Sequence, residues 1–202
     1  MFKKFMIILI AVVFLAAAAQ VSAQAVLMNS AETINKGNLK LALFPTVLFG
    51  KNGGNSVWGL AGRFGYGLTN NIDIEAKAGF FKGLKYFGAD IEYWFLKSGD
   101  FNGSAALGAH MSDYSGGGDS TGIDTSLLFS HKPVEKLEVY GGLMLAFESV
   151  KNSAINYTLI HLVPGLEYRI SDDLDFLAEV GIALNADSRS YASVGLALYL
   201  LR

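Results

Sequence analysis

Apolar and polar residues alternate one by one along most of the chain from Leu39 onward. Between residues 72 and 81 every even position is apolar, and the odd positions include Asp73, Glu75 and Lys77. Successive side chains of a strand point to opposite faces, so this pattern predicts a β-strand with one apolar and one polar face. The pattern recurs in the segments 57–68, 86–95, 104–112, 123–130, 137–148, 160–169, 174–184 and 192–200. With Leu39 to Phe49 these make ten strands, or eight if the first or last hairpins are misread.

Two kinds of connection alternate between these segments. Short polar turns follow the second, fourth, sixth and eighth, and the turn after Tyr66 resembles the one after Tyr168. Looser, Gly- or Ser-rich connections span 50–56, 112–121, 149–156 and 185–190, with Lys82-Gly83 as a short exception. This plan predicts an antiparallel up-and-down barrel with turns on the periplasmic side and loops outside. Pro45 should mark a bulge or a ragged edge in the first strand.

The alternation fits two kinds of barrel, which differ in whether the apolar face of each strand points inward or outward. A soluble, lipocalin-like calyx would place its apolar face inside, and a transmembrane barrel would place it outside. The segments have about 10 residues, the length that crosses a bilayer at a tilt, whereas soluble strands average about 5 to 6. Aromatic residues lie near segment ends on the apolar face, as in interfacial girdles. They are Trp58, Tyr66, Phe80, Phe95, Phe129 and Tyr168. These features favour the transmembrane β-barrel.

The composition agrees with a barrel and excludes several classes of site. The 202 residues are 51% hydrophobic with a mean hydropathy of +0.35, yet the body of the chain has no apolar run of roughly 20 residues, which a spanning helix needs. There is no cysteine, which excludes disulfides, thiol nucleophiles and Cys-ligated metals. The net charge of −2 gives no sign of nucleic-acid binding.

The first residues have the plan of a secretory signal peptide. Lys3 and Lys4 precede an apolar run from Phe5 to Ala19, and Val21-Ser22-Ala23 resembles a cleavage site. A membrane anchor helix is the alternative. We predict a signal peptide at 1–23, a mature N-terminal segment at 24–38 and an outer-membrane β-barrel at 39–202.

Taken together, the chain resembles the small bacterial outer-membrane β-barrel proteins of the broad OmpX- and OmpW-like type. The resemblance rests on the signal peptide, the hairpins of the Tyr66 to Ala76 kind and the final strand Tyr191 to Leu201. It implies location in the cell outer membrane, with outer-membrane lipids and the outer-membrane assembly machinery as partners. Members often end on an aromatic residue, which here is present in shifted form at Tyr199.

The polar face carries charges of both signs at mid-strand positions. Buried charges need partners, so a lumen charge network is the simplest interpretation. Its predicted members are Arg63, Asp73, Glu75, Lys77, Asp90, Glu92, Asp124, Glu138, Glu167, Arg169, Asp175 and Glu179. Counted with Glu148 and Lys40, acids outnumber bases on this face, so any conduction should prefer cations.

Candidate catalytic and metal-ligating residues are few. His110 and Ser112 share a strand face and resemble the His-x-Ser of lipid A deacylases, in which a His-activated Ser attacks an ester. A hydrogen-bonded pair in the lumen is the alternative. His161 could join His110 at a metal, although lone histidines are more often structural. The stretch 116–119 could bind calcium or phosphate but also reads as a loop tip. We assign no catalytic, cofactor or metal residue.

Three functions follow. The first, which we expect, is a non-enzymatic integral outer-membrane barrel, structural or partner-binding, with a lumen filled by side chains. The second is a narrow cation-preferring pore for small solutes. The third is a lipid A ester hydrolase that uses His110 and Ser112.

Overall fold

The structure is a computed structural model that describes residues 28–51, 54–115, 118–154 and 156–200. The predicted signal peptide and the start of the mature N-terminal segment lie outside these residues. Eleven strands occur in the described part: β1 (Leu39–Leu48), β2 (Val57–Gly67), β3 (Ile72–Phe81), β4 (Leu84–Ser98), β5 (Phe101–Tyr114), β6 (Gly118–Val134), β7 (Leu137–Val150), β8 (Asn156–Leu162), β9 (Gly165–Ser171), β10 (Leu174–Ala183) and β11 (Tyr191–Leu200). No helix among these residues is long and apolar enough to cross a membrane.

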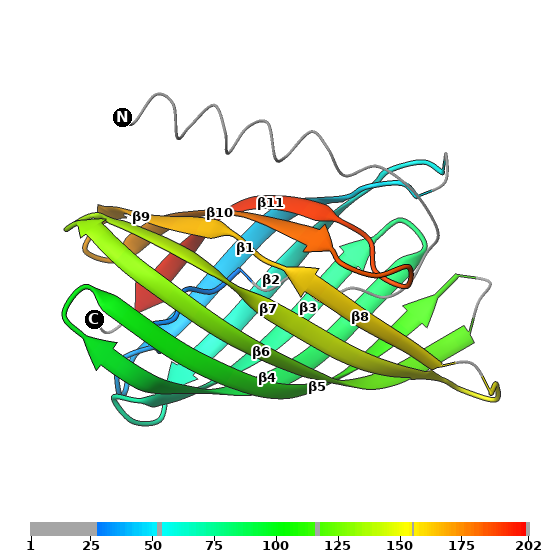
Figure 1. Cartoon of the computed structure of the whole chain (residues 1–202), viewed down its shortest axis with the longest axis horizontal. Helices are drawn as coiled ribbons and strands as arrows, with labels where there is room; N and C mark the ends of the chain where they lie inside the picture. The colour runs from blue at the N-terminus through cyan, green and yellow to red at the C-terminus, as the bar shows by residue number, and fades with distance from the viewer. Residues whose placement is uncertain (1–27, 52–53, 116–117, 155, 201–202) are drawn as a thin grey trace.

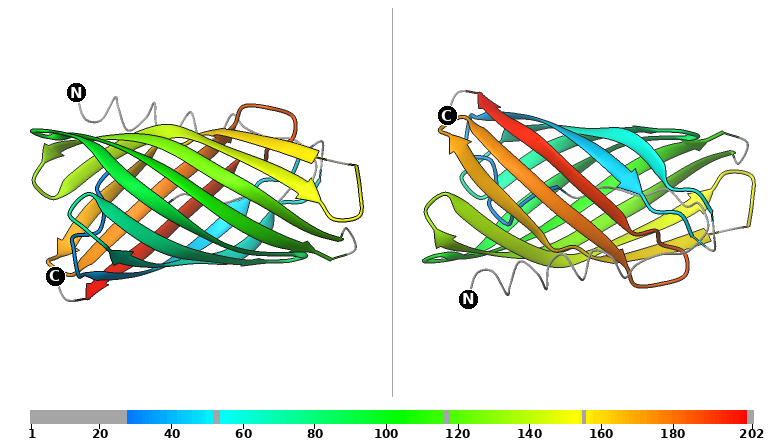
Figure 2. Two further views of the ribbon diagram at one scale, coloured as in Figure 1. Left: turned by 90° about the horizontal axis from the view of Figure 1, so that it is seen from below. Right: turned by 90° about the horizontal axis from the view of Figure 1, so that it is seen from above.

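The strands close into one antiparallel barrel (Figure 1). Apart from β8 and β9, each strand pairs with its neighbour in sequence, and β11 pairs with β1 to close the ring. β8 and β9 both lie between β7 and β10, so they are two halves of one wall strand. The wall therefore has ten strands, which confirms the predicted ten-strand up-and-down barrel. The strands run at a slant in both views of Figure 2.

Prolines interrupt the wall in two places without changing its register. Pro164 separates β8 from β9. Leu162 pairs with Ile182 and Gly165 pairs with Glu179, so both strands advance by three residues across the interruption and the register is kept. Pro45 lies within β1, and the ladder with β11 resumes after it in unchanged register. Of the two alternatives expected at Pro45, the bulge is wrong, because no residue is inserted. The ladder with β11 is instead interrupted at residues 44 and 45, where proline has no N–H to donate.

The hairpin of β5 and β6 is longer than the alternation indicated. A loop was expected at 112–121, but β5 continues to Tyr114 and β6 begins at Gly118. Paired strands of 14 and 17 residues extend the barrel at this end, where backbone pairing continues through polar positions such as Asp113 and Asp119. Polar composition alone therefore misplaced the strand ends.

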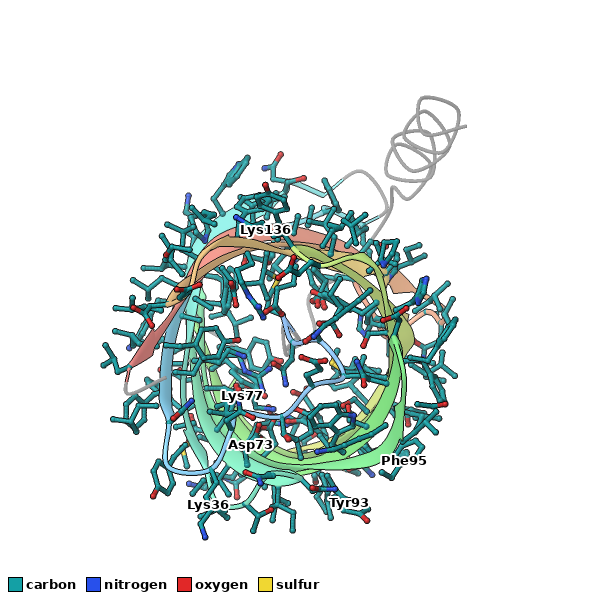
Figure 3. The ribbon with its side chains drawn as sticks, turned by 90° about the vertical axis from the view of Figure 1, so that its left-hand side faces the viewer. Lys36, Asp73, Lys77, Tyr93, Phe95 and Lys136 are labelled. Carbon is teal, nitrogen blue, oxygen red and sulfur yellow. The ribbon has the colours of Figure 1, made fainter. Side chains whose placement is uncertain are left out.

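The exterior of the barrel is apolar and the interior is polar. Outward side chains such as Leu107 and Trp58 are 58% and 71% exposed. Inward side chains such as Glu75 and Lys40 are buried. Figure 3 looks along the barrel and shows Asp73 and Lys77 inside the ring, with Tyr93 and Phe95 outside. The predicted girdle residues Trp58, Tyr66, Phe80, Phe95, Phe129 and Tyr168 are all exposed outside the wall. This is the reverse of a soluble calyx.

Residues 28–38, which we call the luminal segment, run through the lumen as far as Ile34 and reach the exposed rim at Asn35 and Lys36. Met28, Ala31 and Ile34 are buried, and Figure 3 shows the segment within the ring of strands. It leaves the lumen beside β2, where the amide of Gly37 donates to the carbonyl of Gly67 at 2.8 Å. Gly37 has φ +84°, a conformation that favours glycine. The chain thus turns from the lumen into β1.

Candidate functional site

Eight side chains in the middle of the lumen form one continuous series of alternating charge, the ion-pair chain. It begins at Lys40 on β1, crosses β2 to β6, and ends at Glu148 on β7. Arg63 bridges Glu75 and Asp90, and Lys77 bridges Asp90 at 2.8 Å and Asp124 at 3.3 Å. In order, the members are Lys40, Glu75, Arg63, Asp90, Lys77, Asp124, His110 and Glu148. All are buried, so each charge is compensated by a neighbour on an adjacent or nearby strand.

His110 is fully engaged in this chain. Its Nδ1 lies 2.8 Å from Asp124 and its Nε2 lies 2.9 Å from Glu148. Ser112 points inward as well, but its Oγ has no hydrogen-bond partner. Nε2 is hydrogen-bonded to Glu148 and Nδ1 faces Asp124, so both ring nitrogens are directed at carboxylates and neither contacts Ser112. The geometry gives no support to the hydrolase hypothesis.

The other buried acids include three that bind the luminal segment. No ion pair among the described residues involves Asp73, Glu92 or Glu179. Instead, the amide of Ile34 donates to Asp73 at 2.7 Å, the amide of Met28 donates to Glu179 at 2.7 Å, and the Asn29 side chain donates to Glu92. The segment supplies N–H donors to carboxylates that no base reaches. Asp73 and Glu92 lie opposite each other on β3 and β4, and Glu179 lies on β10, so the segment is bonded to two sides of the lumen wall.

Further contacts tie the luminal segment to the wall. Lys40 donates to Asn29 at 2.7 Å. Glu32 pairs with Lys132 at 2.5 Å and accepts from Asn102 at 3.0 Å. The middle and the turn end of the lumen are both occupied by these contacts.

Glu179 lies in a niche built from two tyrosines and two glycines. Tyr140 and Tyr191 donate to it at 3.0 and 2.5 Å. A Cβ at Gly165 would lie 2.2 Å from the Tyr140 ring, and one at Gly181 would lie 1.8 Å from the Tyr191 ring. The absence of side chains at the two glycines is what lets the rings reach the carboxylate.

The remaining predicted network members lie near the turn end. Glu138 is 3.9 Å from Lys132, and Arg169 is 4.0 Å from Asp175. Glu167 and Arg169 are only partly buried. These residues are separate from the ion-pair chain, so the structure places the twelve predicted side chains on one face of the wall but in more than one group.

Sequence reasoning missed the luminal segment and part of the inward face. The excess of acids over bases on the polar face was a usable signal, because buried carboxylates without cations need N–H donors from elsewhere. The inward face is also not uniformly polar. Near the loop end it carries an apolar group, the loop-end cluster, which includes Phe44, Leu48, Phe81, Leu84 and Tyr191 and contacts Met28.

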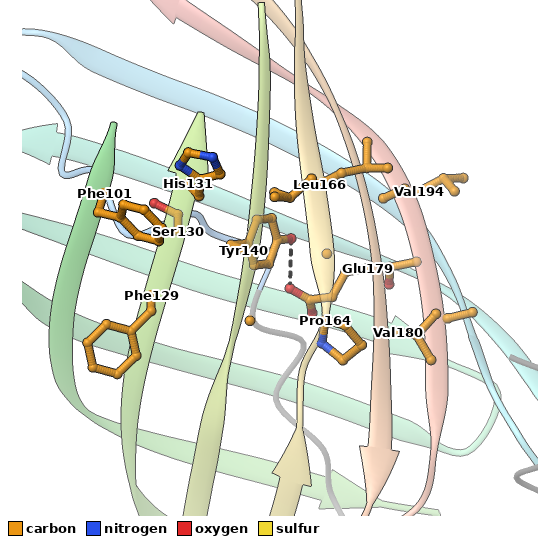
Figure 4. A pocket seen from close by; sticks show the side chains of 16 residues that line it. Phe101, Phe129, Ser130, His131, Tyr140, Pro164, Leu166, Glu179, Val180 and Val194 are labelled. Carbon is orange, nitrogen blue, oxygen red and sulfur yellow. Dashed lines mark hydrogen bonds between the residues drawn. The ribbon is translucent and has the colours of Figure 1, made fainter. Parts of the chain in front are cut away.

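A groove of ≈ 510 Å³ crosses the wall beside Pro164 (Figure 4). Most of its lining is outward and apolar, with Phe129 and Val180 on either side of Gly141 and Pro164. Tyr140 and Glu179, joined by the dashed line in Figure 4, contribute from the inner side. The groove forms where glycine and proline replace larger outward side chains.

No site for a metal forms around the histidines. Nε2 of His161 lies 2.9 Å from the carbonyl oxygen of Arg189, away from the carboxylate partners of His110. Within the residues that the structure describes, no three His, Cys, Asp or Glu side chains are grouped to hold an ion. The stretch 116–119 lies partly outside those residues, and Asp119 is exposed beside Lys151.

Known structures share this architecture. An outer membrane channel from Pseudomonas putida F1 matches with a TM-score of 0.58 and 7% sequence identity over 87% of this chain and 100% of that chain. The N-terminal β-barrel domain of OprF from Pseudomonas aeruginosa matches with a TM-score of 0.40 and 15% identity over 83% of this chain and 100% of that one. No protein-family model and no curated protein matches the sequence. The first likeness shows the fold of a broad outer-membrane barrel type and does not single out the OmpX- or OmpW-like type.

Proposed function

We propose that the chain is an integral outer-membrane β-barrel with a closed lumen, which serves as a structural or partner-binding element of the cell envelope. The exposed apolar exterior supports its placement in lipid, since a charged or polar surface would face water in a soluble protein. Outer-membrane lipids and the assembly machinery are its proposed partners, and no nucleic acid is. We propose no enzymatic activity and no cofactor.

The closed lumen rests on one observation: the luminal segment binds two separate parts of the wall, at Asp73 and Glu92 on the β3–β4 pair and at Glu179 on β10. Together with the ion-pair chain, it fills the middle of a barrel whose ten strands leave more room than eight. Each buried carboxylate that it serves would lose a hydrogen bond if the segment left, so departure is costly.

Single-channel recording in planar bilayers tests the closed lumen. The refolded mature chain should show no steady conductance. Deletion of residues 28–34 should open a cation-selective path, because it exposes acids that no base neutralises. Selectivity should fall in concentrated KCl as the charges are screened. Lys85→Gln, at the exposed loop end, is the control and should stay closed. Steady conductance of the intact chain would favour the pore for small solutes.

Lipid exposure of the apolar exterior has its own test. Leu107→Arg places a charge on the outer face and should destabilise the folded barrel by about 2–4 kcal/mol if it lies near the bilayer midplane. Leu107→Phe keeps the surface apolar and should fold normally. Urea titration of refolding into lipid vesicles measures both. Equal stability of the two variants would contradict the membrane placement.

A further inference from the structure

A cavity of ≈ 650 Å³ opens inside the barrel at its loop end. Leu48, Phe81 and Leu84 of the loop-end cluster line it, together with partly buried Val57 and Tyr157. This volume lies within the roughly 300–1,000 Å³ range of small-molecule sites. Its side chains point inward from the wall, so a ligand would enter from the aqueous side and not from the lipid.

Every charged residue that lines this cavity is basic. They are Lys82, Lys151 and Arg189, and no Asp or Glu is among the lining residues. Lys82 is exposed, and the Lys151 ammonium lies 3.8 Å from exposed Asp119. The lumen middle has a surplus of acids, so the loop-end cavity has the opposite electrostatic character.

Arg189 is the distinctive member because it is buried without an acid. It is 3% exposed, and its hydrogen bonds go to the backbone carbonyls of Phe49 at 2.9 Å and Asn55 at 3.3 Å. Burial lowers its pKa from the ordinary value, but a guanidinium stays protonated at neutral pH. These two bonds use Nε and one hydrogen of Nη2, and Arg189 also lines the cavity, so further donors of the guanidinium can serve a ligand there. A buried cation held only by neutral oxygens is a site for an anion.

We propose that this cavity binds a small amphipathic carboxylate, with the carboxylate on Arg189 and the apolar body against Leu48, Phe81 and Leu84. The planar guanidinium suits a carboxylate because it offers two parallel N–H donors. Lys82 and Lys151 add a positive field that attracts anions to the mouth. The inference deepens the partner-binding role proposed above. A protein that conducts but still binds the carboxylate would refute the closed lumen and leave this site intact.

Equilibrium dialysis with radiolabelled decanoate tests the proposal, using the intact mature chain in phosphatidylcholine nanodiscs and empty nanodiscs to subtract partitioning. Saturable binding at one site is expected, with uncharged decanol at least tenfold weaker, a difference of about 1.4 kcal/mol. Arg189→Gln should weaken decanoate binding at least tenfold, and Arg189→Lys should weaken it less. Lys85→Gln removes a base from the same end of the barrel that does not line the cavity, and should leave binding unchanged.

A second variant keeps the test decisive if Arg189→Gln fails to fold. Leu84→Trp fills the cavity without changing its charge, and should abolish decanoate binding. Heat-modifiable migration on a denaturing gel reports whether each variant is folded. Decanol binding as tight as decanoate, unchanged affinity in folded Arg189→Gln, or an absence of saturable binding would overturn the proposal.

Discussion

The middle and the loop end of the lumen are built from inward positions of the same strands, yet they pack in different ways. On β3, Glu75 and Lys77 join the ion-pair chain, and Phe81 at the end of the strand joins the loop-end cluster. In the middle of the lumen the side chains are held by ion pairs, and most of the charged groups contact two partners. At the loop end the described luminal segment contributes only Met28, and a cavity remains. Strand parity thus decides which residues face inward, but not whether the space between them is filled.

The largest loss of stability should follow removal of a cation that pairs with two acids in the middle of the lumen. Arg63→Leu leaves Glu75 and Asp90 each without one of their cations. Breaking a buried ion pair typically costs about 3–5 kcal/mol, and we expect a loss of that size. Urea unfolding in lipid vesicles measures it. Lys151→Leu is the control: it removes an exposed base 3.8 Å from exposed Asp119 and should cost less than about 1 kcal/mol. Similar losses in both variants would mean that the ion-pair chain does not hold the middle together.

The boundary between the regions can be tested by overpacking the niche of Glu179. Gly181→Val should cost about 1–3 kcal/mol, because the new side chain displaces the Tyr191 ring from the carboxylate. Gly141→Val is the matched control, since the nearest atom to a Cβ there is 4.0 Å away, on the outer side. Thermal unfolding followed by gel mobility compares the two. If Gly141→Val proves the more harmful, the niche is not the constraint.

Shortening a side chain in the loop-end cluster should have a smaller effect. Phe81→Ala is expected to cost about 1–2 kcal/mol, below the roughly 3–5 typical of closed cores, because Phe81 already faces an open cavity. Phe81→Leu should retain most of the stability. The same urea titration applies. A loss as large as that of Arg63→Leu would show that the loop end is as tightly packed as the middle.

The smallest effect is expected outside both regions. Lys85 and Asp113 lie 3.6 Å apart with both side chains more than half exposed. Exposed pairs contribute little, so Lys85→Gln should change the free energy of unfolding by no more than about 0.5 kcal/mol. A change above about 1 kcal/mol would indicate that exposed charge pairs at the loop end stabilise the barrel, and would contradict the difference between the loop end and the middle of the lumen.

Several properties could be predicted from particular residues. The alternation around Asp73, Glu75 and Lys77 placed these side chains on one face, because the period of a strand is two regardless of its neighbours. The tight turns after Tyr66 and Tyr168 indicated the order of the hairpins. The site was less predictable: Arg189 lies in a connection with no periodicity, and only the closed ring places it over Leu48 and Phe81.

By itself, the sequence determined the strands, their neighbours in the wall and the parity that separates lumen from exterior, since these depend on local geometry and the order of short connections. The tertiary structure decided how the lumen is filled. The ion-pair chain includes contacts that skip one or two strands, such as that from Lys77 on β3 to Asp124 on β6, so its order depends on the curvature of the wall. The luminal segment has no strand pattern, and its place depends on carboxylates brought together from β3, β4 and β10. Hydrogen bonding of this kind leaves no periodic signal in the chain, because the segment and its partners on β3–β4 and β10 become neighbours only when the wall curves round the lumen.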